Sequence, residues 1–518
     1  MTDIKRTALP SYTEVVIIGA GLGGLNMGIQ LQKHGQNDYL ILEKGHDVGG
    51  TWRDNSYPGC ACDVQSHLYS YSFTDKSDWS KRYAPWHEIQ DYILSTTEEY
   101  NLRPHIRFGL EVNSAVYNEQ TARWRVGTSD GQCVECRFFV VATGPLHHPQ
   151  IPNIPGLDTF QGKVMHSARW DHDYDLTGKR VASIGTGGSA IQYVPEIAPQ
   201  VAHMDVYQRS AAWVIPRDER PYSKATKWVF KTFPSLRRLY RGRLYLTNEM
   251  RVWPIFHPSL AAIGGWLAKQ FIRWQVKDPV TRQKLTPDYT LGCKRILISN
   301  KWYPTFNRDN VDLITDGIQE IRAHSIVDSQ GVEREVDTII LGTGFIVDPR
   351  GYMNQFDLRG LGGRRLLDDW QDGAESYLGN TIHGYPNLFQ LVGPNAGLGH
   401  NSILFMIEAQ VHYILQCMAQ VKKRNVDALC VKEHAQREFN REIQERIKNS
   451  VWSTGCRSWY QQSDGKNFAL WPYSTWAFYR RNQTVIAHHY DWQSAQAESA
   501  QDVTPIEMQQ TTRKRKAS

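Results

Sequence analysis

The pattern of hydrophobic and polar positions near the N-terminus predicts a strand, a helix and a second strand in close succession. Glu14–Ile18 is a short β-branched run that ends in glycine, and Tyr39–Leu42 is a second apolar run. Between them, apolar residues recur at helical spacing through Ile29 and Leu31. This order is that of a βαβ unit, in which the two strands are parallel members of one sheet.

Glycines in the first turn of this unit predict a dinucleotide site. Gly19, Gly21 and Gly24 have GxGxxG spacing, and Glu43 ends the second strand 24 residues after Gly19. In such a unit the first glycine permits the tight turn, the second lets a pyrophosphate approach the backbone, and the third lets helix and strand pack closely. The phosphates lie at the helix N-terminus, and the acid accepts hydrogen bonds from a ribose diol.

A second unit of the same kind begins at Arg180–Ile184 and continues to a strand at His203–Tyr207. Arg209 lies 24 residues after Gly185, the same offset as Glu43 from Gly19, but it offers a guanidinium that can bind a phosphate. We therefore expect FAD in the first unit and NADPH in the second. The second turn reads Gly185-Thr186-Gly187-Gly188-Ser189-Ala190, with Ala190 in place of the third glycine and Ser210 following Arg209.

Further along the chain, apolar strand runs alternate with loops. Pro145–Pro155 is proline-dense and predicts a linker, and Thr338–Phe345 is a strand before Gly-Thr-Gly that we interpret as a return into the first domain. Asn387–Gly393 predicts another buried strand, and Ser402–Val421 predicts a helix. The fold class is α/β, with two Rossmann-like dinucleotide-binding domains and a helical insertion. The predicted boundaries are 1–150 and 336–490 for the FAD-binding domain, 151–221 and 286–335 for the NADPH-binding domain, 222–285 for the insertion, and 491–518 for a disordered tail.

Pro221–Val280 departs from the α/β pattern. It holds 11 Lys and Arg residues against two acids, Glu249 and Asp278. The interpretation that we favour is a helical insertion with a solvated basic face and its aromatic residues in the core. Weak peripheral attachment to anionic lipid is the other interpretation. The aromatic residues are Trp228, Phe230, Phe233, Tyr240, Trp253, Phe256, Trp266 and Trp274.

Length and composition describe an ordinary globular protein with more than one domain. The 518 residues exceed what one hydrophobic core organises, so two or three domains are expected. Charged residues make up 22% and hydrophobic residues 41% of the chain. The net charge of +6 is small for this length, which argues against a nucleic-acid-binding protein.

The sequence has eight cysteines, and its first residues do not resemble a secretory signal peptide. We therefore expect a cytoplasmic enzyme whose thiols are reduced. Cys133 and Cys136 have CxxC spacing, but no second pair completes a site, and we expect no metal. A redox disulfide between Cys60 and Cys62 would need a strained CxC spacing and is not expected. No apolar run approaches the roughly 18 residues of a membrane-spanning helix.

Two longer motifs accompany the glycine turns. The first reads FxGxxxHxxxWD, and the second, from Gly49 to Asp63, reads GGxWxxxxYPGxxxD. Both match the signatures of the Baeyer–Villiger monooxygenases at every fixed position, and the chain resembles that family from about Glu14 to Arg481, least in the insertion. The fixed residues of the first motif are Phe160, Gly162, His166, Trp170 and Asp171.

The resemblance implies a specific chemistry. In this family NADPH reduces FAD, dioxygen adds at flavin C4a, and the peroxyflavin attacks a ketone, which gains one oxygen and becomes an ester or lactone. The catalytic Arg matches Arg295, its carboxylate partner matches Asp63, and the family gives its motif His, here His166, a role in coupling the domains. The cofactor-binding residues are Gly19, Gly21, Gly24, Glu43, Gly50, Thr51, Trp52, Gly185, Thr186, Gly187, Ser189, Ala190, Arg209, Ser210, Lys294 and Trp459, of which Lys294 matches a 2′-phosphate contact and Trp459 a nicotinamide ribose contact.

Physical chemistry agrees with this assignment. A fixed cation stabilises an oxygen anion strongly in a dry site, and Arg295 cannot lose its proton there. Related flavin monooxygenases that oxygenate nitrogen or sulfur need no such Arg and are the alternative. A flavin disulfide reductase and a non-catalytic flavin-binding module are less favoured. The loops Pro394–Asn401 and Trp452–Trp471 are rich in Gly and aromatic residues, which indicates an apolar ketone as the substrate beside O2.

Overall fold

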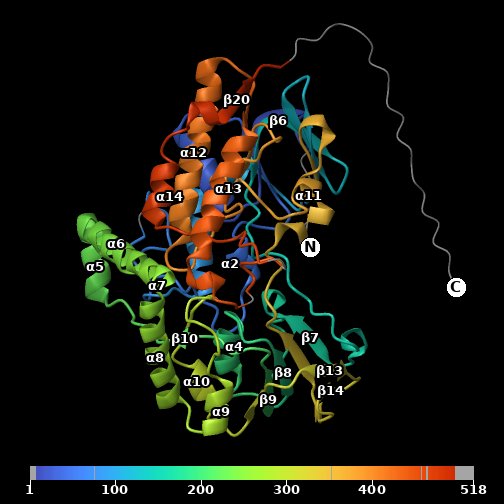
Figure 1. The fold of residues 1–518 in the computed structure, drawn as a ribbon, viewed down its shortest axis with the longest axis vertical. Helices are drawn as coiled ribbons and strands as arrows, with labels where there is room; N and C mark the ends of the chain where they lie inside the picture. Colours follow the sequence, from blue (N-terminus) through green and yellow to red (C-terminus); the bar gives the residue numbers. More distant parts are fainter. Residues whose placement is uncertain (1–7, 75, 352, 457, 463–464, 496–518) are drawn as a thin grey trace, which may run out of the picture.

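Two open α/β sheets, each with its own helices, form two lobes stacked along the long axis of the molecule (Figure 1). The computed structural model describes residues 8–74, 76–351, 353–456, 458–462 and 465–495. The first lobe contains the N-terminal sheet and the C-terminal helices, and the second lobe contains the sheet formed around residues 163–341.

The first lobe is built on an eight-stranded sheet with the order β17-β4-β5-β6-β1-β2-β3 and with β18 beside β6. Strand β1 runs parallel to both β2 and β6, and the helix between β1 and β2 is α1 (Leu22–Lys33), as the hydrophobic pattern predicts. The long helix α12 (Ile403–Arg424) packs on α1. The strands are β1 (Tyr12–Ile18), β2 (Tyr39–Glu43), β3 (Ile106–Phe108), β4 (Val112–Asn118), β5 (Arg123–Thr128), β6 (Cys133–Val141), β17 (Asp357–Arg359) and β18 (Leu388–Gln390).

The second lobe is built on a five-stranded parallel sheet with the order β12-β9-β8-β16-β7. Its strands β8 (Arg180–Ile184) and β9 (His203–Tyr207) have the predicted bounds, and α4 (Ala190–Ile197) follows β8. The other strands of this sheet are β7 (Lys163–His166), β12 (Val311–Ile314) and β16 (Thr338–Leu341), and a separate antiparallel sheet contains β13 (Ile318–Ile321), β14 (Ser325–Asp328) and β15 (Glu333–Glu335).

Strand β16 corrects one sequence prediction. Thr338–Phe345 was expected to return into the first domain, but Thr338–Leu341 lies between β7 and β8 in the second sheet. All four residues of β16 are buried, as in a central strand of either sheet, so its composition could not distinguish the two sheets. The predicted boundary at residue 336 therefore lies too early, because the chain leaves the second sheet only after Leu341.

The two connections between the lobes lie side by side. Pro149 of the first connection forms an antiparallel bridge with Phe345 of the second. The Gln150 backbone N–H donates to the Gly344 carbonyl oxygen at 2.9 Å. The predicted linker around residues 145–155 is thus one half of a two-stranded hinge.

The insertion is helical, as predicted, and lies along the left edge of the molecule in Figure 1. Its helices are α5 (Lys224–Thr232), α6 (Pro234–Glu249), α7 (Trp253–Phe256), α8 (Pro258–Gln275) and α9 (Pro279–Lys284). The expectation that its aromatic residues form core holds for Phe230, which is 8% exposed. It is wrong for five others, Trp228, Phe233, Trp253, Trp266 and Trp274, whose exposed fractions run from 47% to 79%.

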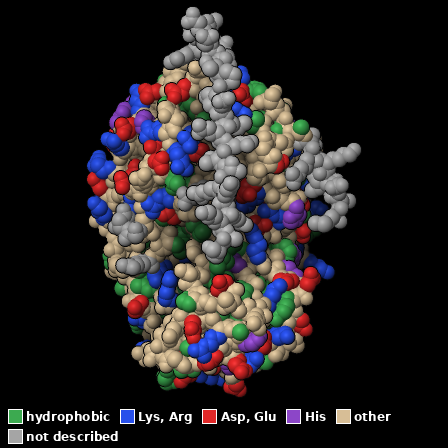
Figure 2. Space-filling model, turned by 90° about the vertical axis from the view of Figure 1, so that its right-hand side faces the viewer, with side chains coloured by type: hydrophobic (Ala, Val, Ile, Leu, Met, Phe, Trp, Pro, Cys, Tyr) green, Lys and Arg blue, Asp and Glu red, His purple; other side chains and the backbone are tan. Residues whose placement is uncertain are grey.

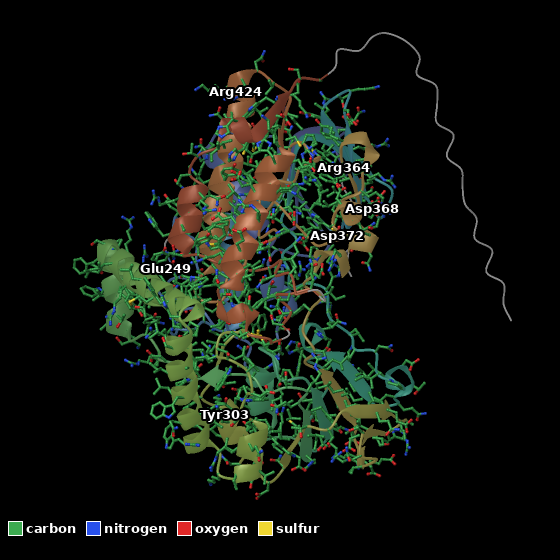
Figure 3. All side chains as sticks on the ribbon, in the orientation of Figure 1. Glu249, Tyr303, Arg364, Asp368, Asp372 and Arg424 are labelled. Carbon is green, nitrogen blue, oxygen red and sulfur yellow. A yellow bond between two sulfur atoms is a disulfide. The ribbon has the colours of Figure 1, made fainter. Side chains whose placement is uncertain are left out.

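Glu249 at the end of α6 ties the insertion to the first lobe (Figure 3). Its carboxylate accepts hydrogen bonds from Asn401 Nδ2 at 2.7 Å, from the Thr475 backbone N–H at 2.6 Å and from Thr475 Oγ1 at 2.7 Å. Burial raises the pKa of this carboxyl, but the nearby His400, whose Nε2 lies 3.7 Å from Oε2, and the hydrogen bonds from Thr475 outweigh it and lower the pKa to about 2.

The remaining elements connect or cover the two sheets. Strand β20 contains residues 491–493 of the predicted tail, and residues 496–518 lie outside the described part of the chain. No helix among the described residues combines the length and the apolarity needed to cross a bilayer. The elements are α2 (Thr51–Asp54), α3 (Trp86–Glu99), α10 (Trp302–Thr305), α11 (Leu366–Asp369), α13 (Glu433–Lys448), α14 (Thr475–Arg481), β10 (Val214–Ile215), β11 (Leu297–Ile298), β19 (Ala428–Val431) and β20 (Tyr490–Gln493).

A disulfide between Cys293 and Cys456 corrects the prediction that all thiols are reduced. It joins the segment that precedes β11 to the loop after α13, across a sequence separation of 163 residues. The pairing depends on tertiary proximity, with the two Cα atoms 6.2 Å apart, so spacing could not reveal it. The other six cysteines, which include the CxxC pair and the CxC pair, are free.

We predict that Glu249→Gln destabilises the protein at pH 7 by about 2–3 kcal/mol, because the variant loses a carboxylate whose pKa is depressed on folding. Since the folded pKa lies near 2 and the ordinary value is 4.5, this contribution is complete above pH 4.5 and is lost as the pH falls toward 2. Thermal melting of the wild type and of Glu249→Gln at pH 7 and at pH 3 measures the difference in stability between them. This difference should be smaller at pH 3 than at pH 7 by about half or more. The control Glu445→Gln removes an exposed pair with Arg441 and should change little.

If Cys293 and Cys456 are paired, protein that is purified without reductant and then unfolded in denaturant should contain six reactive thiols. After reduction it should contain eight. Cys456→Ser should give seven without reduction, because Cys293 is then released. Titration with a thiol reagent measures all three numbers. Eight thiols in the unreduced wild-type protein would contradict the pairing.

Candidate active site between the two lobes

The first glycine turn leaves backbone open for a phosphate group. Gly19 has φ +99°, and a Cβ on it would lie 2.7 Å from the Ala142 carbonyl oxygen. A Cβ on Gly24 would lie 1.9 Å from the Gly19 oxygen, whereas a Cβ on Gly21 meets only the Gly50 Cα, at 3.9 Å. Gly21 also begins α1 without a side-chain cap, so the first N–H groups of the helix are available to an anion. The turn therefore fits a dinucleotide pyrophosphate.

Glu43 lies at the end of β2 with its carboxylate beside this turn. Its Oε2 accepts a hydrogen bond from the Ala20 N–H at 2.8 Å, and its Oε1 accepts from the Gly45 N–H at 2.7 Å and from Arg53 Nη1 at 3.0 Å. Oε2 thus has one protein partner, and its second lone pair fits a ribose hydroxyl. Arg53 was not predicted, although it lies inside the second motif.

The remaining flavin-site candidates of the first lobe lie at the beginning of α2. Gly50 has φ +52° and immediately precedes this helix, whose first residue is Thr51. A Cβ on Gly50 would lie 3.3 Å from the Gly21 Cα, so the two glycine segments approach each other closely. Trp52 is 8% exposed and donates from Nε1 to Tyr69 Oη at 3.1 Å.

The second glycine turn repeats the geometry of the first. Gly185 has φ +106°, and a Cβ on it would lie 2.4 Å from the Gly342 carbonyl oxygen. A Cβ on Gly187 would meet no atom within 4 Å, so the backbone there is open. Ser189 and Ala190 begin α4, and Thr186 Oγ1 donates to the Ser210 carbonyl oxygen at 3.4 Å.

Basic side chains gather beside this turn from separate parts of the chain. Lys294 Nζ donates to Ser210 Oγ at 3.3 Å and lies 4.6 Å from the centre of the Tyr289 ring. Burial lowers the pKa of Lys294, and the positive charge of the exposed Arg209 lowers it further. Lys294 and Arg209 are both positively charged and repel each other, and a bound anion would offset this repulsion. The two cations and the Ser210 hydroxyl therefore suit the 2′-phosphate of NADPH.

An ion pair joins the lobes at their junction. Arg295 Nε donates to Asp63 Oδ2 at 3.2 Å, and Arg295 Nη2 donates to the same oxygen. Burial raises the pKa of Asp63, but the Arg295 guanidinium outweighs it and holds that pKa below its usual range. Each side chain keeps about a third of its surface accessible, 34% for Arg295 and 35% for Asp63, so the charged pair faces open space. In Figure 2, hydrophobic side chains gather in a hollow between the upper and lower parts of the molecule.

Aromatic and basic residues that sequence reasoning missed surround the pair. Tyr460 is 2% exposed, and burial raises its pKa to about 12 while the charge of Arg295 lowers it. Arg217 Nη2 donates to the Cys62 carbonyl oxygen at 3.2 Å, and its charge also lowers the pKa of Asp63. Tyr460 follows the predicted Trp459, but no sequence signal pointed to Arg217.

Trp459 lies on the loop that the disulfide attaches to the Arg295 segment. It is 46% exposed, and its ring centre is 4.3 Å from that of Tyr460. Cys456 precedes it by three residues, and Cys293 precedes Arg295 by two. The disulfide therefore attaches the loop that carries the predicted nicotinamide contact to the segment that carries Arg295.

The motif from Gly49 to Asp63 packs against α4 of the other lobe. Gln192 Oε1 accepts hydrogen bonds from Tyr57 Oη at 3.1 Å and from the Ala61 N–H at 3.2 Å, and Gln192 Nε2 donates to the Ala61 oxygen at 3.0 Å. Gly59 has φ +76°, and a Cβ there would lie 2.9 Å from the backbone carbonyl oxygen of Gln192. This motif is therefore an interface between the lobes.

The first motif, Phe160–Asp171, places its histidine at the hinge. His166 is 5% exposed, its Nδ1 accepts from the Ala168 N–H at 3.1 Å, and its Nε2 lies 3.1 Å from the Gly344 oxygen. Because one nitrogen accepts and the other faces a carbonyl, the ring is neutral with its proton on Nε2, and burial lowers its pKa. This supports a role at the hinge rather than in proton transfer.

The other residues of that motif are structural. Phe160 is buried in the core of the second lobe, and a Cβ on Gly162 would lie 2.4 Å from the Asp337 oxygen. Trp170 lies 5.5 Å from the Tyr193 ring of α4. Asp171 forms an ion pair with Lys163 at the start of β7.

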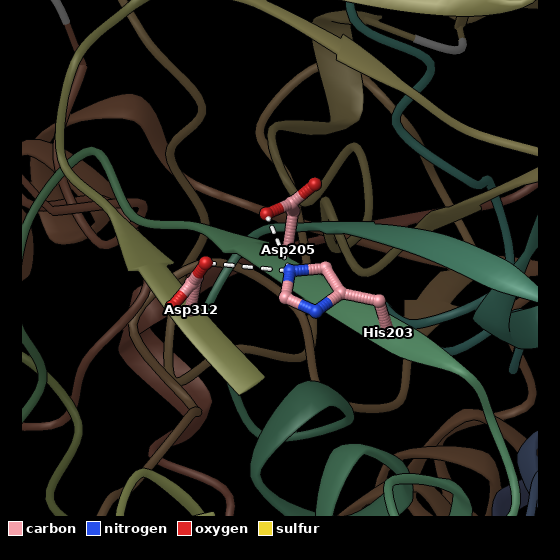
Figure 4. A group of neighbouring side chains, drawn as sticks. All are labelled: His203, Asp205 and Asp312. Carbon is pink, nitrogen blue, oxygen red and sulfur yellow. Dashed lines mark ion pairs between the residues drawn. The ribbon is translucent and has the colours of Figure 1, made fainter. Parts of the chain in front are cut away.

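One other cluster of potential ligands exists among the described residues. His203 Nε2 lies 3.5 Å from Asp205 Oδ1 of the same strand, β9, and 3.3 Å from Asp312 Oδ2 of the neighbouring strand, β12 (Figure 4). Direct contact of the imidazole with the two carboxylates is enough to explain this geometry. The expectation that the protein uses no metal stays a prediction.

The chain is similar in sequence and in fold to proteins that are named monooxygenases. Residues 16–248 match a family model described as pyridine nucleotide-disulphide oxidoreductase. A Baeyer–Villiger monooxygenase of Pseudomonas aeruginosa is 46% identical over 484 residues, which cover 92% of this chain and 91% of that protein. An oxidized steroid monooxygenase bound to NADP has a TM-score of 0.84 and 31% identity over 93% of this chain and 100% of that chain. An OTEMO complex with FAD and NADP has a TM-score of 0.85 and 28% identity over 92% of this chain and 99% of that chain.

The sequence identity extends over nine-tenths of both this chain and the Pseudomonas protein. The shared fold extends over both lobes. The chain belongs to the Baeyer–Villiger monooxygenase family.

Proposed function

We propose that the protein is an NADPH- and FAD-dependent Baeyer–Villiger monooxygenase that inserts one oxygen atom of O2 beside the carbonyl of an apolar ketone to give an ester or lactone. When bound, NADPH supplies a hydride and FAD uses it to activate dioxygen. The residues of this chain bind and orient the two cofactors, exclude water and stabilise negative charge. A cytoplasmic location and the absence of a nucleic-acid partner stay predictions from composition.

The observation that carries the proposal is the charged pair Arg295–Asp63 at the lobe junction. A guanidinium in a partly dry site stabilises an oxygen anion far more than water does, and its donors are aimed before the reaction begins. Asp63 keeps this cation paired when no substrate is present, because an unpaired charge there would be costly. Arg295 Nη1 forms no hydrogen bond to Asp63, so the fork has donors left for the reacting oxygen.

The cofactor order follows from the two glycine turns. Glu43 at the first turn suits the free diol of FAD, whereas Arg209, Ser210 and Lys294 at the second suit the 2′-phosphate of NADPH. Residues up to about 144 and from about 346 to 490 would then bind FAD, and the second sheet with its returns would bind NADPH. Trp459 would lie against the nicotinamide ribose.

The substrate side is formed by two loops that lie together. Gly397 forms a bridge with Leu470, and the Trp471 N–H donates to the Gly397 oxygen at 2.8 Å. These contacts join the segments 394–401 and 452–471, whose glycine and aromatic content suits an apolar ketone.

The geometry favours this reaction over its rivals. Oxygenation of soft nitrogen or sulfur atoms needs no guanidinium at the flavin, whereas attack on a carbonyl develops negative charge that Arg295 can stabilise. A disulfide reductase needs a redox pair after the first glycine turn, but Cys60 and Cys62 are free and buried. Burial raises the pKa of the Cys60 thiol to about 12, which makes it unreactive.

Arg295→Ala should retain FAD and be reduced by NADPH, yet ester formation should fall by about 100-fold or more because the fixed cation is lost. Flavin absorbance, anaerobic reduction by NADPH and product mass measure the three properties separately. Arg295→Lys keeps the charge without the fork and should retain an intermediate rate. Normal ester formation by Arg295→Ala would refute the assignment.

Alanine substitutions in the glycine turns should separate folding from cofactor binding. Gly21→Ala has room in the protein and should melt like the wild type without cofactor, but its methyl group lies where the pyrophosphate approaches, so FAD retention should fall. Gly24→Ala meets a backbone oxygen and should destabilise the fold by at least about 2 kcal/mol. Gly187→Ala is the matched control, which should keep FAD and raise the KM for NADPH. Full flavin occupancy in Gly21→Ala would place the flavin elsewhere.

A further inference from the structure

The helical insertion carries most of the exposed large hydrophobic side chains of the described chain. Twenty such residues are at least 38% exposed, and thirteen of them lie between residues 228 and 280. A water-soluble surface normally spreads such side chains singly, and a concentration of this kind marks a binding surface. In Figure 1 the helices that carry them form the left edge of the molecule.

Helix α8 is amphipathic with its large apolar side outward. Leu260, Ile263, Trp266, Leu267 and Trp274 are 44–79% exposed and recur at spacings that place them on one side of a helix. The opposite side is buried and consists mainly of small residues, namely Ala261, Gly265, Ala268 and Ile272. The helix therefore packs by its small side and presents its large apolar side to the surroundings.

Helix α6 has the same inverted arrangement. Leu236, Leu239, Leu246 and Met250 at its end are 47–72% exposed. By contrast, the residues that α6 buries are two polar ones, Arg237 and Asn248, and one leucine, Leu244. An ordinary surface helix would place these residue types the other way round.

The insertion is held firmly, so the outward apolar side is a built surface. Asn248 Nδ2 donates to Gln65 Oε1 at 2.7 Å, and Gln65 Nε2 donates to Asn248 Oδ1 at 3.3 Å, both groups being buried. Arg241 Nη2 donates to the Ser70 oxygen at 3.0 Å. Together with the Glu249 contacts, these bonds fix α6 to the first lobe.

Cations are interleaved with the apolar side chains. Residues 221–280 contain 11 Lys and Arg against two acids, and Glu249 is turned inward to Thr475. The exposed cations Arg238, Arg243, Lys269 and Arg273 form no ion pair among the described residues. A second copy of this chain would present the same positive charge and be repelled. The surface is complementary to a partner that is both apolar and anionic.

We propose that the outward side of α5–α8 docks on the surface of an anionic phospholipid membrane, with the helices lying in the interface and not crossing it. Tryptophan prefers the boundary between headgroups and acyl chains, and leucine side chains enter the acyl region. Lys and Arg beside them contact the lipid phosphates. Exposed tryptophans at both ends of the insertion, Trp228 and Trp274, extend the surface over its whole length.

The test is co-sedimentation of the holoenzyme, with FAD and NADP⁺ bound, with vesicles of phosphatidylcholine alone or mixed with phosphatidylglycerol. The protein should sediment with the mixed vesicles at low salt, and raising the salt should weaken the binding because lipid charges are screened. The variant Leu267→Ser/Lys269→Glu should bind about tenfold or more weakly. Its turnover of ketone in solution should not change, since both residues are exposed and lie outside the cofactor sites.

The matched control is Val332→Ser/Lys423→Glu, which makes the same kinds of change at exposed positions on the second-lobe hairpin and at the end of α12. It should bind mixed vesicles like the wild type. The proposal is overturned if the wild type stays in the supernatant, if phosphatidylcholine alone binds equally well, or if both variants lose binding equally. A lipid-free dimer that Leu267→Ser/Lys269→Glu dissociates would also overturn it and assign the surface to a second copy.

Discussion

The Arg295 guanidinium and the Asp63 carboxylate come from different lobes, and the rest of the site is arranged around their contact. The pair requires that the Gly49–Asp63 segment be pressed against α4, which the reciprocal Gln192 hydrogen bonds accomplish. It also requires the segment before β11 to reach the junction, where the disulfide attaches it to the loop that carries Trp459. A charged group at a partly dry junction is stable only when it is paired, so the same interaction that prepares an oxygen-anion site also holds the lobes in register.

The two family motifs become intelligible once the lobes are in contact. Apart from Asp63, which ends the Gly49–Asp63 motif, neither motif contributes a group to the charged pair. Tyr57 and Gly59 of one pack on α4, and His166 of the other is hydrogen-bonded to the hinge at Gly344. The residues of both motifs fix the position of one lobe relative to the other. The guanidinium of Arg295 belongs to neither motif.

The insertion follows a different constraint from the rest of the chain. In the two sheets, apolar residues are buried, whereas α6 and α8, apart from Leu244 and Ile272, bury small or polar side chains and expose leucine and tryptophan. Exposure of these apolar side chains to water is unfavourable in free energy, and a membrane surface that covers them removes this cost. The unpaired cations among these residues define the chemistry of that surface as anionic, independently of the reaction in the junction.

Local pattern alone determined the two βαβ units, the bounds of β8 and β9, and the positions of the glycines, because strand and helix periods and the GxGxxG turn are properties of neighbouring residues. The approach of Lys294 to Ser210 and of Arg295 to Asp63 was inferred only through family motifs, since residues more than 80 positions apart carry no local signal. Tertiary structure alone decided that β16 joins the second sheet, that Cys293 pairs with Cys456, and that the insertion's tryptophans face outward. Each of these depends on which surfaces meet in space: a buried apolar strand fits either sheet, a thiol pairs with whichever thiol lies near, and a helix can turn either side to its neighbours.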